Sequence, residues 1–143
     1  MVTISLCMIV KNEERVLGRC LESVQEIADE IIIVDTGSED RTKEIAEKYH
    51  ARVFEQEWQD DFSRARNYSF SQAEMDYCMW LDADDIITKS EVLKLKRWKE
   101  KTDGSSDVIM IRYVAGFDEK RNPTLVYYRE RIVKRNKDFQ WQG

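Results

Sequence analysis

The sequence predicts an α/β fold, in which a mostly parallel central sheet has flanking helices and an appended β-hairpin. Three observations support this class. Short, nearly continuous apolar runs are typical of strands that are buried on both faces. Segments with apolar residues at helical spacing separate these runs, and the last third of the chain is rich in strand-forming residues. The alternation of strands and helices indicates right-handed crossovers between parallel strands.

Four segments are expected to form the parallel strands. Residues 4–10, 31–34 and 77–81 are short, apolar and nearly continuous, and residues 52–55 are a weaker candidate. Because parallel strands are covered by helices on both faces, they are expected to lack the polar and apolar alternation of exposed sheets. These runs therefore predict the centre of the sheet.

Three helices are expected between these strands. Apolar residues recur at helical spacing from Val16 to Ala28, which predicts a first helix with Asn12 as its N-cap. A turn at residues 36–40 leads to a short second helix, and a third helix precedes the last parallel strand. The residues of the second and third helices that are expected to face inward are Ile45, Ala46, Tyr49, Phe62, Ala65, Ser69, Phe70 and Ala73.

The last third of the chain has a different pattern. Thr88, with Glu91 three residues on, is a capping-box signature for a fourth helix that extends to about Lys101. Beyond it, residues 107–117 and 124–135 are β-rich and flank a polar link that holds the only proline. We therefore expect a hairpin appended to the parallel core.

Length and charge exclude several classes of protein. The chain has 143 residues and a formal net charge of −5. This length predicts one domain, residues 1–143, with one hydrophobic core. No apolar run approaches the roughly 18 residues of a membrane helix, and the first residues lack the features of a secretory signal. An acidic chain without a basic stripe is not expected to bind nucleic acid.

Cysteine and histidine are too scattered for a zinc site with the usual spacing. The chain has one His and three Cys, which are Cys7, Cys20 and Cys78. An odd number of cysteines without disulfide spacing indicates a reducing, cytoplasmic location. Carboxylates are abundant, so any metal here should be a hard cation held by oxygen.

Acidic residues follow several of the predicted strands. Ligands of open α/β sheets bind beyond the carboxyl ends of the strands, which makes residues 11–13, 35–38 and 82–85 the candidates. Asp and Asn also favour turns and helix starts. A role in a turn or at a helix start explains the presence of any one of these residues. It explains less well why acidic residues occur in three loops at the same edge of the sheet.

The sharpest signal is the pair Asp82 and Asp84 at the end of a buried strand. Side chains at i and i+2 of an extended segment point the same way, so both carboxylates are expected to project together. Adjacent carboxylates repel each other unless a positive group lies between them. A divalent cation, Mg²⁺ or Mn²⁺, is the simple solution, with water and substrate phosphates as its other ligands.

Two further residues each allow two interpretations. Asp35 closes an apolar strand, where its carboxylate can accept hydrogen bonds from a ribose hydroxyl or a base N–H, or can act as a turn residue. Arg66 lies in the helical segment before the acidic cluster, where it can contact phosphate or form a salt bridge with an Asp. The chain has no Gly-x-Gly-x-x-Gly after the first strand and no Walker loop, which argues against a dinucleotide-binding Rossmann domain.

Four segments together resemble the nucleotide-sugar glycosyltransferases of family two, which have the Rossmann-like GT-A fold. They are residues 9–14 (IVKNEE), 33–42 (IVDTGSEDRT), 61–67 (DFSRARN) and 80–85 (WLDADD). They occur in the family order and at family-like spacing, and the match covers roughly residues 3–90 well. The middle segment resembles a bacterial branch that glycosylates peptides, proteins or cell-surface glycans.

The resemblance implies roles for individual residues. The nucleotide-binding residues that it implies are Ile9, Val10, Lys11, Glu13, Asp35, Arg66, Asp82 and Ala83. Asp35 would hydrogen-bond the base, for which the family suggests uracil, and Asp82 and Asp84 would hold Mn²⁺ or Mg²⁺. Many relatives have Tyr where Lys11 stands. Asp85 is often Glu in this branch and is given no catalytic role.

The implied reaction is transfer of a sugar from a nucleotide diphosphate sugar, a UDP-sugar first of all, to a saccharide, peptide or protein acceptor. A metal would stabilise the charge that grows on the leaving diphosphate, and an inverting enzyme also needs a carboxylate base. Candidates for this base by residue type alone are Asp107, Asp118, Glu119 and Glu130. Residues 139–143 resemble a family segment that normally continues, so we expect a chain truncated at its C-terminus, with the base beyond it.

Two alternative functions and one possible assembly remain open. The chain can be a nucleotide-binding fragment without transfer activity. It can also be a haloacid-dehalogenase-like phosphatase, although the motif of that class continues differently after Asp-x-Asp and follows the first strand. Exposed edges of the hairpin make self-association into a homo-oligomer possible.

Overall fold

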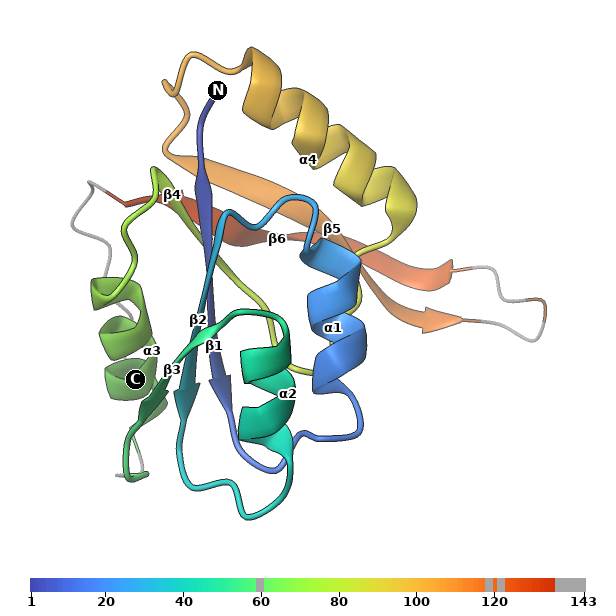
Figure 1. Ribbon diagram of the computed structural model, residues 1–143. Coiled ribbons are helices and arrows are strands. Elements are labelled where there is room, and N and C mark those ends of the chain that lie inside the picture. The colour runs from blue at the N-terminus through green and yellow to red at the C-terminus, as the bar shows by residue number, and fades with distance from the viewer. Residues whose placement is uncertain (59–60, 118–119, 121–122, 136–143) are drawn as a thin grey trace.

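The computed structural model describes residues 1–58, 61–117, 120 and 123–135. Within these ranges, strands and helices alternate until the final hairpin (Figure 1). Their bounds in chain order are β1 (Ile4–Val10), α1 (Leu17–Val24), β2 (Glu30–Asp35), α2 (Thr42–Lys48), β3 (Arg52–Glu55), α3 (Phe62–Ser71), β4 (Tyr77–Trp80), α4 (Lys89–Lys101), β5 (Val108–Phe117) and β6 (Pro123–Lys134).

The strands form one sheet in the order β3-β2-β1-β4-β6-β5. The first four of these are parallel: Cys7 of β1, for example, is in register with Ile32 of β2 and with Trp80 of β4. The carboxyl ends of β1, β2, β3 and β4 therefore share one edge of the sheet. The predicted α/β class with a mostly parallel sheet is confirmed, and so is the weaker strand candidate at Arg52–Glu55.

Helices cover both faces of this sheet (Figure 1). On one face, α1, α2 and α4 pack over a large apolar cluster that includes Leu6, Leu21, Ile33, Ala46, Met79 and Leu95. On the other face, residues from α3 and the end of β3 pack over a smaller cluster, which contains Cys7, Ile32, Ala73, Cys78 and Val133 with Phe54 and Phe70. Coverage of both faces explains why β1, β2 and β4 are almost continuously apolar.

The start of α1 differs from the prediction. The helix begins at Leu17, and its N-cap position, Val16, has no side-chain cap. Asn12 is therefore not the N-cap. It has a φ of 52°, in the left-handed region that Asn tolerates better than most residues, and its side-chain oxygen accepts a hydrogen bond of 2.8 Å from the backbone N–H of Glu39. The loop after β2 thus captures the side chain that was expected to cap the helix.

The other helices occur where they are predicted, although α1 ends at Val24, before Ile27 and Ala28, and α3 ends at Ser71, before Ala73. Thr88 caps α4, since its Oγ1 accepts a hydrogen bond of 3.3 Å from the N–H of Glu91. Ala65 and Ser69 are buried in α3, whereas Phe62, the first residue of that helix, is 49% exposed. The expected inward orientation of Phe62 is therefore wrong, because its ring lies on the surface, where the Arg66 guanidinium packs against it.

The predicted hairpin is present and extends the sheet. β5 and β6 pair antiparallel, and β6 also pairs antiparallel with β4, with Ile132 opposite Met79 and Val133 opposite Cys78. The hairpin therefore contributes a strand directly beside β4, the strand that leads into the turn at residues 82–85, called the acidic turn below. In the described part of the chain, no helix combines the length and apolar character that crossing a membrane requires.

Candidate functional site

The loops after β1 and β2 are bound to each other by reciprocal hydrogen bonds. The N–H of Asn12 donates to Oγ of Ser38 at 2.9 Å, while the Asn12 side chain accepts from Glu39. The N–H of Glu13 donates to Oγ1 of Thr42 at 2.8 Å. Because these bonds cross between the two loops, residues 11–14 and 35–42 form one connected rim at the carboxyl edge of the sheet.

Asp40 is the acidic centre of this rim. Its carboxylate accepts hydrogen bonds from the N–H and the hydroxyl of Thr42 and from the N–H of Glu14. These bonds, above all the one from the Thr42 hydroxyl, lower the pKa of Asp40. Thr42 is fully buried. Its hydroxyl lies between Asp40 and the backbone of Glu13, because it donates to the first and accepts from the second. The sequence pattern predicts a turn at residues 36–40 but indicates no particular role for Asp40.

Asp35 has the turn role that its sequence position allowed, and it fills that role with one of its two carboxylate oxygens. The residue is 2% exposed, and its Oδ1 accepts hydrogen bonds from the N–H groups of Gly37 at 2.9 Å and Ser38 at 2.7 Å. These bonds make it a turn residue. Its other oxygen, Oδ2, is buried and has no hydrogen-bond partner in the part of the chain that the structure describes. Buried polar atoms are nearly always paired, so Oδ2 is an acceptor suited to a ligand donor.

Asp82 and Asp84 lie on a turn after β4, which corrects the expectation of an extended segment. The N–H of Asp85 donates to the carbonyl of Asp82 at 2.9 Å, which closes the turn. The N–H of Asp82 in return donates to Oδ2 of Asp85 at 2.8 Å. Asp82 and Asp84 are exposed, whereas Ala83 between them is 5% exposed. The two carboxylates are thus presented to solvent while the turn itself packs against the protein.

Arg66 reaches this turn from α3. It is 7% exposed, and its Nη2 lies 3.7 Å from Oδ1 of Asp82. Its guanidinium carbon lies 4.3 Å from the ring centroid of Trp80 and 4.6 Å from that of Phe62, distances typical of cation–π contacts. Of the two roles open from the sequence, the structure shows the ion pair with Asp82.

Glu13 connects the rim electrostatically to the acidic turn. The pKa of Glu13 is raised by partial burial and then by the negative charges of Asp84, Asp40 and Asp82. The loops after β1, β2 and β4 therefore concentrate negative charge at one edge, as the order of the strands predicts. Lys11, at the same edge, is exposed, whereas Val10 is buried and Ile9 is half-buried.

Cys20 and Arg131 are site residues that sequence analysis missed. The buried Cys20 of α1 donates from Sγ to the carbonyl of Asp82 at 3.7 Å. Burial, followed by the charges of Asp85, Asp82 and Asp84, raises the pKa of this thiol to about 12, so it remains a neutral donor at pH 7. Arg131 of β6 binds the carboxylate of Asp85. Neither contact has a local sequence signal, because each joins elements that are distant in the chain.

The acceptor-base candidates occupy different places. Glu130 is exposed on β6, and its backbone carbonyl accepts a hydrogen bond of 3.1 Å from Nε1 of Trp80, close to the acidic turn. Asp107 lies at the opposite edge, where its charge helps to raise the pKa of Tyr77 at the start of β4. Asp118 and Glu119 lie outside the described residues.

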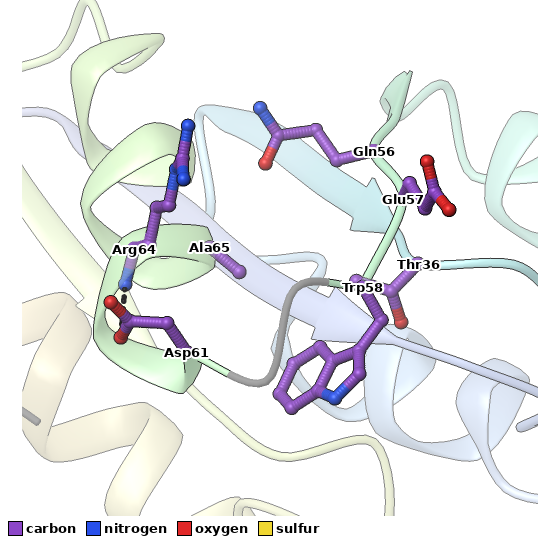
Figure 2. A pocket seen from close by; sticks show the side chains of 7 residues that line it. All are labelled: Thr36, Gln56, Glu57, Trp58, Asp61, Arg64 and Ala65. Atoms are coloured by element: carbon purple, nitrogen blue, oxygen red, sulfur yellow. Dashed lines mark hydrogen bonds between the residues drawn. The ribbon is translucent and has the colours of Figure 1, made fainter.

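A small cavity adjoins this edge of the sheet between the ends of β2 and β3 and the start of α3. It has a volume of about 250 Å³ and is lined by Thr36, Gln56, Glu57, Trp58, Asp61, Arg64 and Ala65. Figure 2 shows Asp61, Arg64 and Ala65 on α3 and its N-cap, facing Trp58 and Thr36 across the cavity. Two of its lining residues adjoin Asp35. Thr36 follows Asp35 in the chain, and the N–H of Gln56 donates to the Asp35 carbonyl at 2.8 Å.

The acidic turn has the donor chemistry of a hard divalent cation. Among the described residues, no group of three or more His, Cys, Asp or Glu side chains is arranged to hold a metal ion. Mg²⁺, however, commonly uses only one or two carboxylates and takes its remaining ligands from water and substrate phosphates. The exposed pair Asp82 and Asp84 matches that limited requirement.

A mixed sheet with acidic loops at its carboxyl edge is the architecture of the GT-A glycosyltransferases. Solved structures with this fold superimpose on the chain. Residues 5–142 match the model of glycosyl transferase family 2, and the chain therefore belongs to this family. Family membership confirms the predicted resemblance and replaces the phosphatase alternative.

Relatives of the chain are longer proteins. A TPR repeat-containing protein of Synechococcus elongatus is 36% identical over 143 residues, which are 99% of this chain and 34% of the relative. The glycosyltransferase SunS of Bacillus subtilis is 32% identical over 97 residues, which are 66% of this chain and 23% of that protein. The chain thus spans about a third or less of these relatives.

The similar solved structures include complexes with nucleotide. TarS of S. aureus in complex with UDP is 27% identical, with a TM-score of 0.54 over 66% of this chain and 31% of that one. Glucosyl-3-phosphoglycerate synthase from Mycobacterium tuberculosis, in complex with Mn²⁺, UDP and phosphoglyceric acid, is 26% identical. Its TM-score is 0.52, and the match covers 59% of this chain and 34% of that one.

Proposed function

We propose that this chain is the donor-binding domain of an inverting glycosyltransferase and binds a UDP-sugar at the carboxyl edge of its sheet. The observation that carries the proposal is the buried, unpaired Oδ2 of Asp35 beside an acidic turn. An acceptor of this kind suits the N3–H of uracil, because the N–H would satisfy an atom whose burial is otherwise costly.

Different residues of the chain would contact different parts of the nucleotide. Ile9, Val10, Lys11 and Glu13 would line the nucleoside side of the site, and Asp35 would accept from the base. Asp82 and Ala83 would lie by the ribose. Arg66 would place its positive charge near the diphosphate, since it already reaches Asp82.

The acidic turn would bind the diphosphate through a cation. Asp82 and Asp84 would hold Mn²⁺ or Mg²⁺, which when bound supplies Lewis-acid stabilisation of the negative charge on the leaving diphosphate. Without such a cation, two exposed carboxylates would repel an anionic nucleotide. The synthase structure with Mn²⁺ and UDP supports this part of the proposal by similarity.

The acceptor is proposed as a saccharide, peptide or protein hydroxyl, attacked with inversion at the sugar carbon. That step needs a carboxylate base. Of the described candidates from the sequence, Glu130 has its backbone beside Trp80, just before the acidic turn, whereas Asp107 lies at the opposite edge of the sheet. We also propose a cytoplasmic location, since all three cysteines are free buried thiols.

The test is a thermal-shift series with a panel of nucleoside diphosphates and their sugars, each with Mn²⁺ and with a chelator. We expect UDP and one UDP-sugar to raise the melting temperature much more with Mn²⁺ than with a chelator; at a hundredfold excess over Kd, binding stabilises by about 2.7 kcal/mol. Asp84→Ala should abolish the shift. Asp76→Asn is the control, because Asp76 binds Thr3 at the other end of β4. Absence of any nucleotide-dependent shift would refute the proposal.

A further inference from the structure

The carboxylate of Asp85 joins the acidic turn to the hairpin strand β6. Its Oδ2 accepts one hydrogen bond from the N–H of Asp82 at 2.8 Å and another from Nη1 of Arg131 at 3.0 Å. The Asp85 side chain is 15% exposed and that of Arg131 is 4% exposed. A single oxygen of a largely buried ion pair therefore holds the backbone of the first residue of the acidic turn.

Arg131 makes further contacts with the same segment. Its Nη1 also lies 3.4 Å from the carbonyl of Trp80, and its guanidinium carbon lies 4.0 Å from the Trp80 ring centroid. Arg66 contacts the same ring, at 4.3 Å, and forms the ion pair with Asp82. The Trp80 ring is thus contacted by two guanidinium groups, of which one holds the side chain of Asp82 and the other its backbone through Asp85.

Helix α1 supports the same turn from the other side. Cys20 donates to the carbonyl of Asp82, and Oγ of Ser23 accepts from the N–H of Ile87 at 3.2 Å. These contacts fix the two ends of the segment. Between the ends, the side chains of Asp82 and Asp84 are exposed, so their direction depends on the backbone conformation that the Asp85 carboxylate maintains.

We infer that Asp85 and Arg131 are positioning residues that orient Asp82 and Asp84 for a metal–diphosphate ligand. The inference rests on the proposed function and goes beyond it, because neither residue is expected to touch nucleotide or metal. Groups that orient metal ligands are typically worth about 10- to 100-fold in metal affinity. Arg131 lies on β6, so the hairpin is part of the donor site's support.

The test measures the affinity for UDP by isothermal titration calorimetry, once in the presence of Mn²⁺ and once in the presence of a chelator. The readout is the ratio of these two affinities. The variants are Arg131→Lys, which keeps the charge but not the planar fork, and the double variant Asp85→Asn/Arg131→Gln, which leaves no unpaired buried charge. The matched control is Asp29→Asn/Lys99→Gln. It removes another ion pair, of 2.6 Å with a buried lysine, at the opposite edge of the sheet. Circular dichroism verifies that each protein is folded.

We expect both site variants to lower the Mn²⁺-dependent gain in UDP affinity about tenfold or more, with the chelated affinity nearly unchanged. Arg131→Lys should retain part of the gain, and it keeps the test available if the double variant does not fold. The control should retain the full gain even where its stability falls. A full gain in the folded site variants would overturn the inference. Wild-type protein without any Mn²⁺-dependent gain would instead refute the proposed function itself.

Discussion

Arg66 and Asp82 form an ion pair of 3.7 Å between a buried cation and an exposed carboxylate. The guanidinium approaches the acidic turn from α3, between the rings of Phe62 and Trp80, while the carboxylate remains accessible from solvent. The pair therefore places one positive charge at the inner side of a site that is otherwise acidic. In the proposed function, this charge would face the diphosphate.

Replacing Arg66 with Ala should weaken UDP binding. Hydrogen bonds to charged groups are worth about 1.5–3 kcal/mol, so we expect a loss of about 10- to 100-fold, measured by calorimetry with Mn²⁺. The control is Arg97→Ala, because Arg97 is exposed on α4. Equal affinities in the Arg66 and Arg97 variants would exclude Arg66 from the nucleotide site.

Replacing Asp35 with Asn should leave the fold intact and change base selectivity. The turn bonds from Gly37 and Ser38 go to Oδ1, which an Asn oxygen can replace. The amide nitrogen would then stand where Oδ2 is buried, and it would donate instead of accepting. We expect UDP affinity to fall about tenfold or more, with CDP less affected because N3 of cytosine is an acceptor. Competition between UDP and CDP measures this, and an unchanged preference for UDP would contradict the assigned role.

The general fold and the location of the site follow from local patterns. The apolar runs identify β1, β2 and β4, and their parallel order is enough to bring Asp35 and Asp82 to one edge. The capping box at Thr88 is equally local, since Oγ1 and the N–H that it accepts from lie three residues apart. Such features depend on residues close in the chain, where periodicity and capping preferences apply.

Contacts between distant elements could not be predicted in this way. Arg131 is 46 residues from Asp85, and Cys20 is 62 residues from Asp82, so no periodic pattern reports either pair. The same limit explains Asn12. Its local preference for an N-cap lost to a hydrogen bond with Glu39, 27 residues away. The sequence located the acidic turn, therefore, but not the residues that support it.

Replacing Thr42 with Val should destabilise the rim formed by residues 11–14 and 35–42. The Thr42 hydroxyl accepts from the N–H of Glu13 and donates to Asp40. Loss of a partner for a shielded donor costs about 1–3 kcal/mol, which urea unfolding measures, and UDP affinity should fall as the rim loosens. The control is Thr102→Val, which removes a hydrogen bond to Gly104 far from the site. If both variants bind UDP with the affinity of the wild type, the hydrogen bonds of the rim do not contribute to nucleotide binding.

Glu13→Gln should change how stability depends on pH. The pKa of Glu13 is raised in the folded state, so the folded state binds its proton more tightly than the unfolded state does. The stability of the wild type then falls as pH rises from about 4.3, the ordinary value, through the raised value. The Gln variant lacks this loss, so its stability relative to the wild type should be greater at pH 7 than at pH 3.5.

Urea unfolding at the two pH values measures this difference. Glu22→Gln is the control, since Glu22 is exposed on α1. A relative stability of the Glu13 variant that is independent of pH, or that falls as pH rises, would show that the acidic turn does not act on Glu13.

The most direct measurement of the central claim is a ¹H–¹⁵N correlation spectrum of the wild type, titrated with UDP and Mg²⁺. We expect the amide signals of Lys11, Gly37, Ser38 and Asp84 to shift, because they lie at the carboxyl edge of the sheet. Those of Thr3, Asp29 and Asp76 should stay unchanged, because these residues lie at the opposite edge, where Asp76 accepts from the N–H of Thr3 and Asp29 accepts from the N–H of Ile4 in β1. Shifts confined to that opposite edge, or no shifts with UDP and Mg²⁺, would contradict a nucleotide site at the acidic turn.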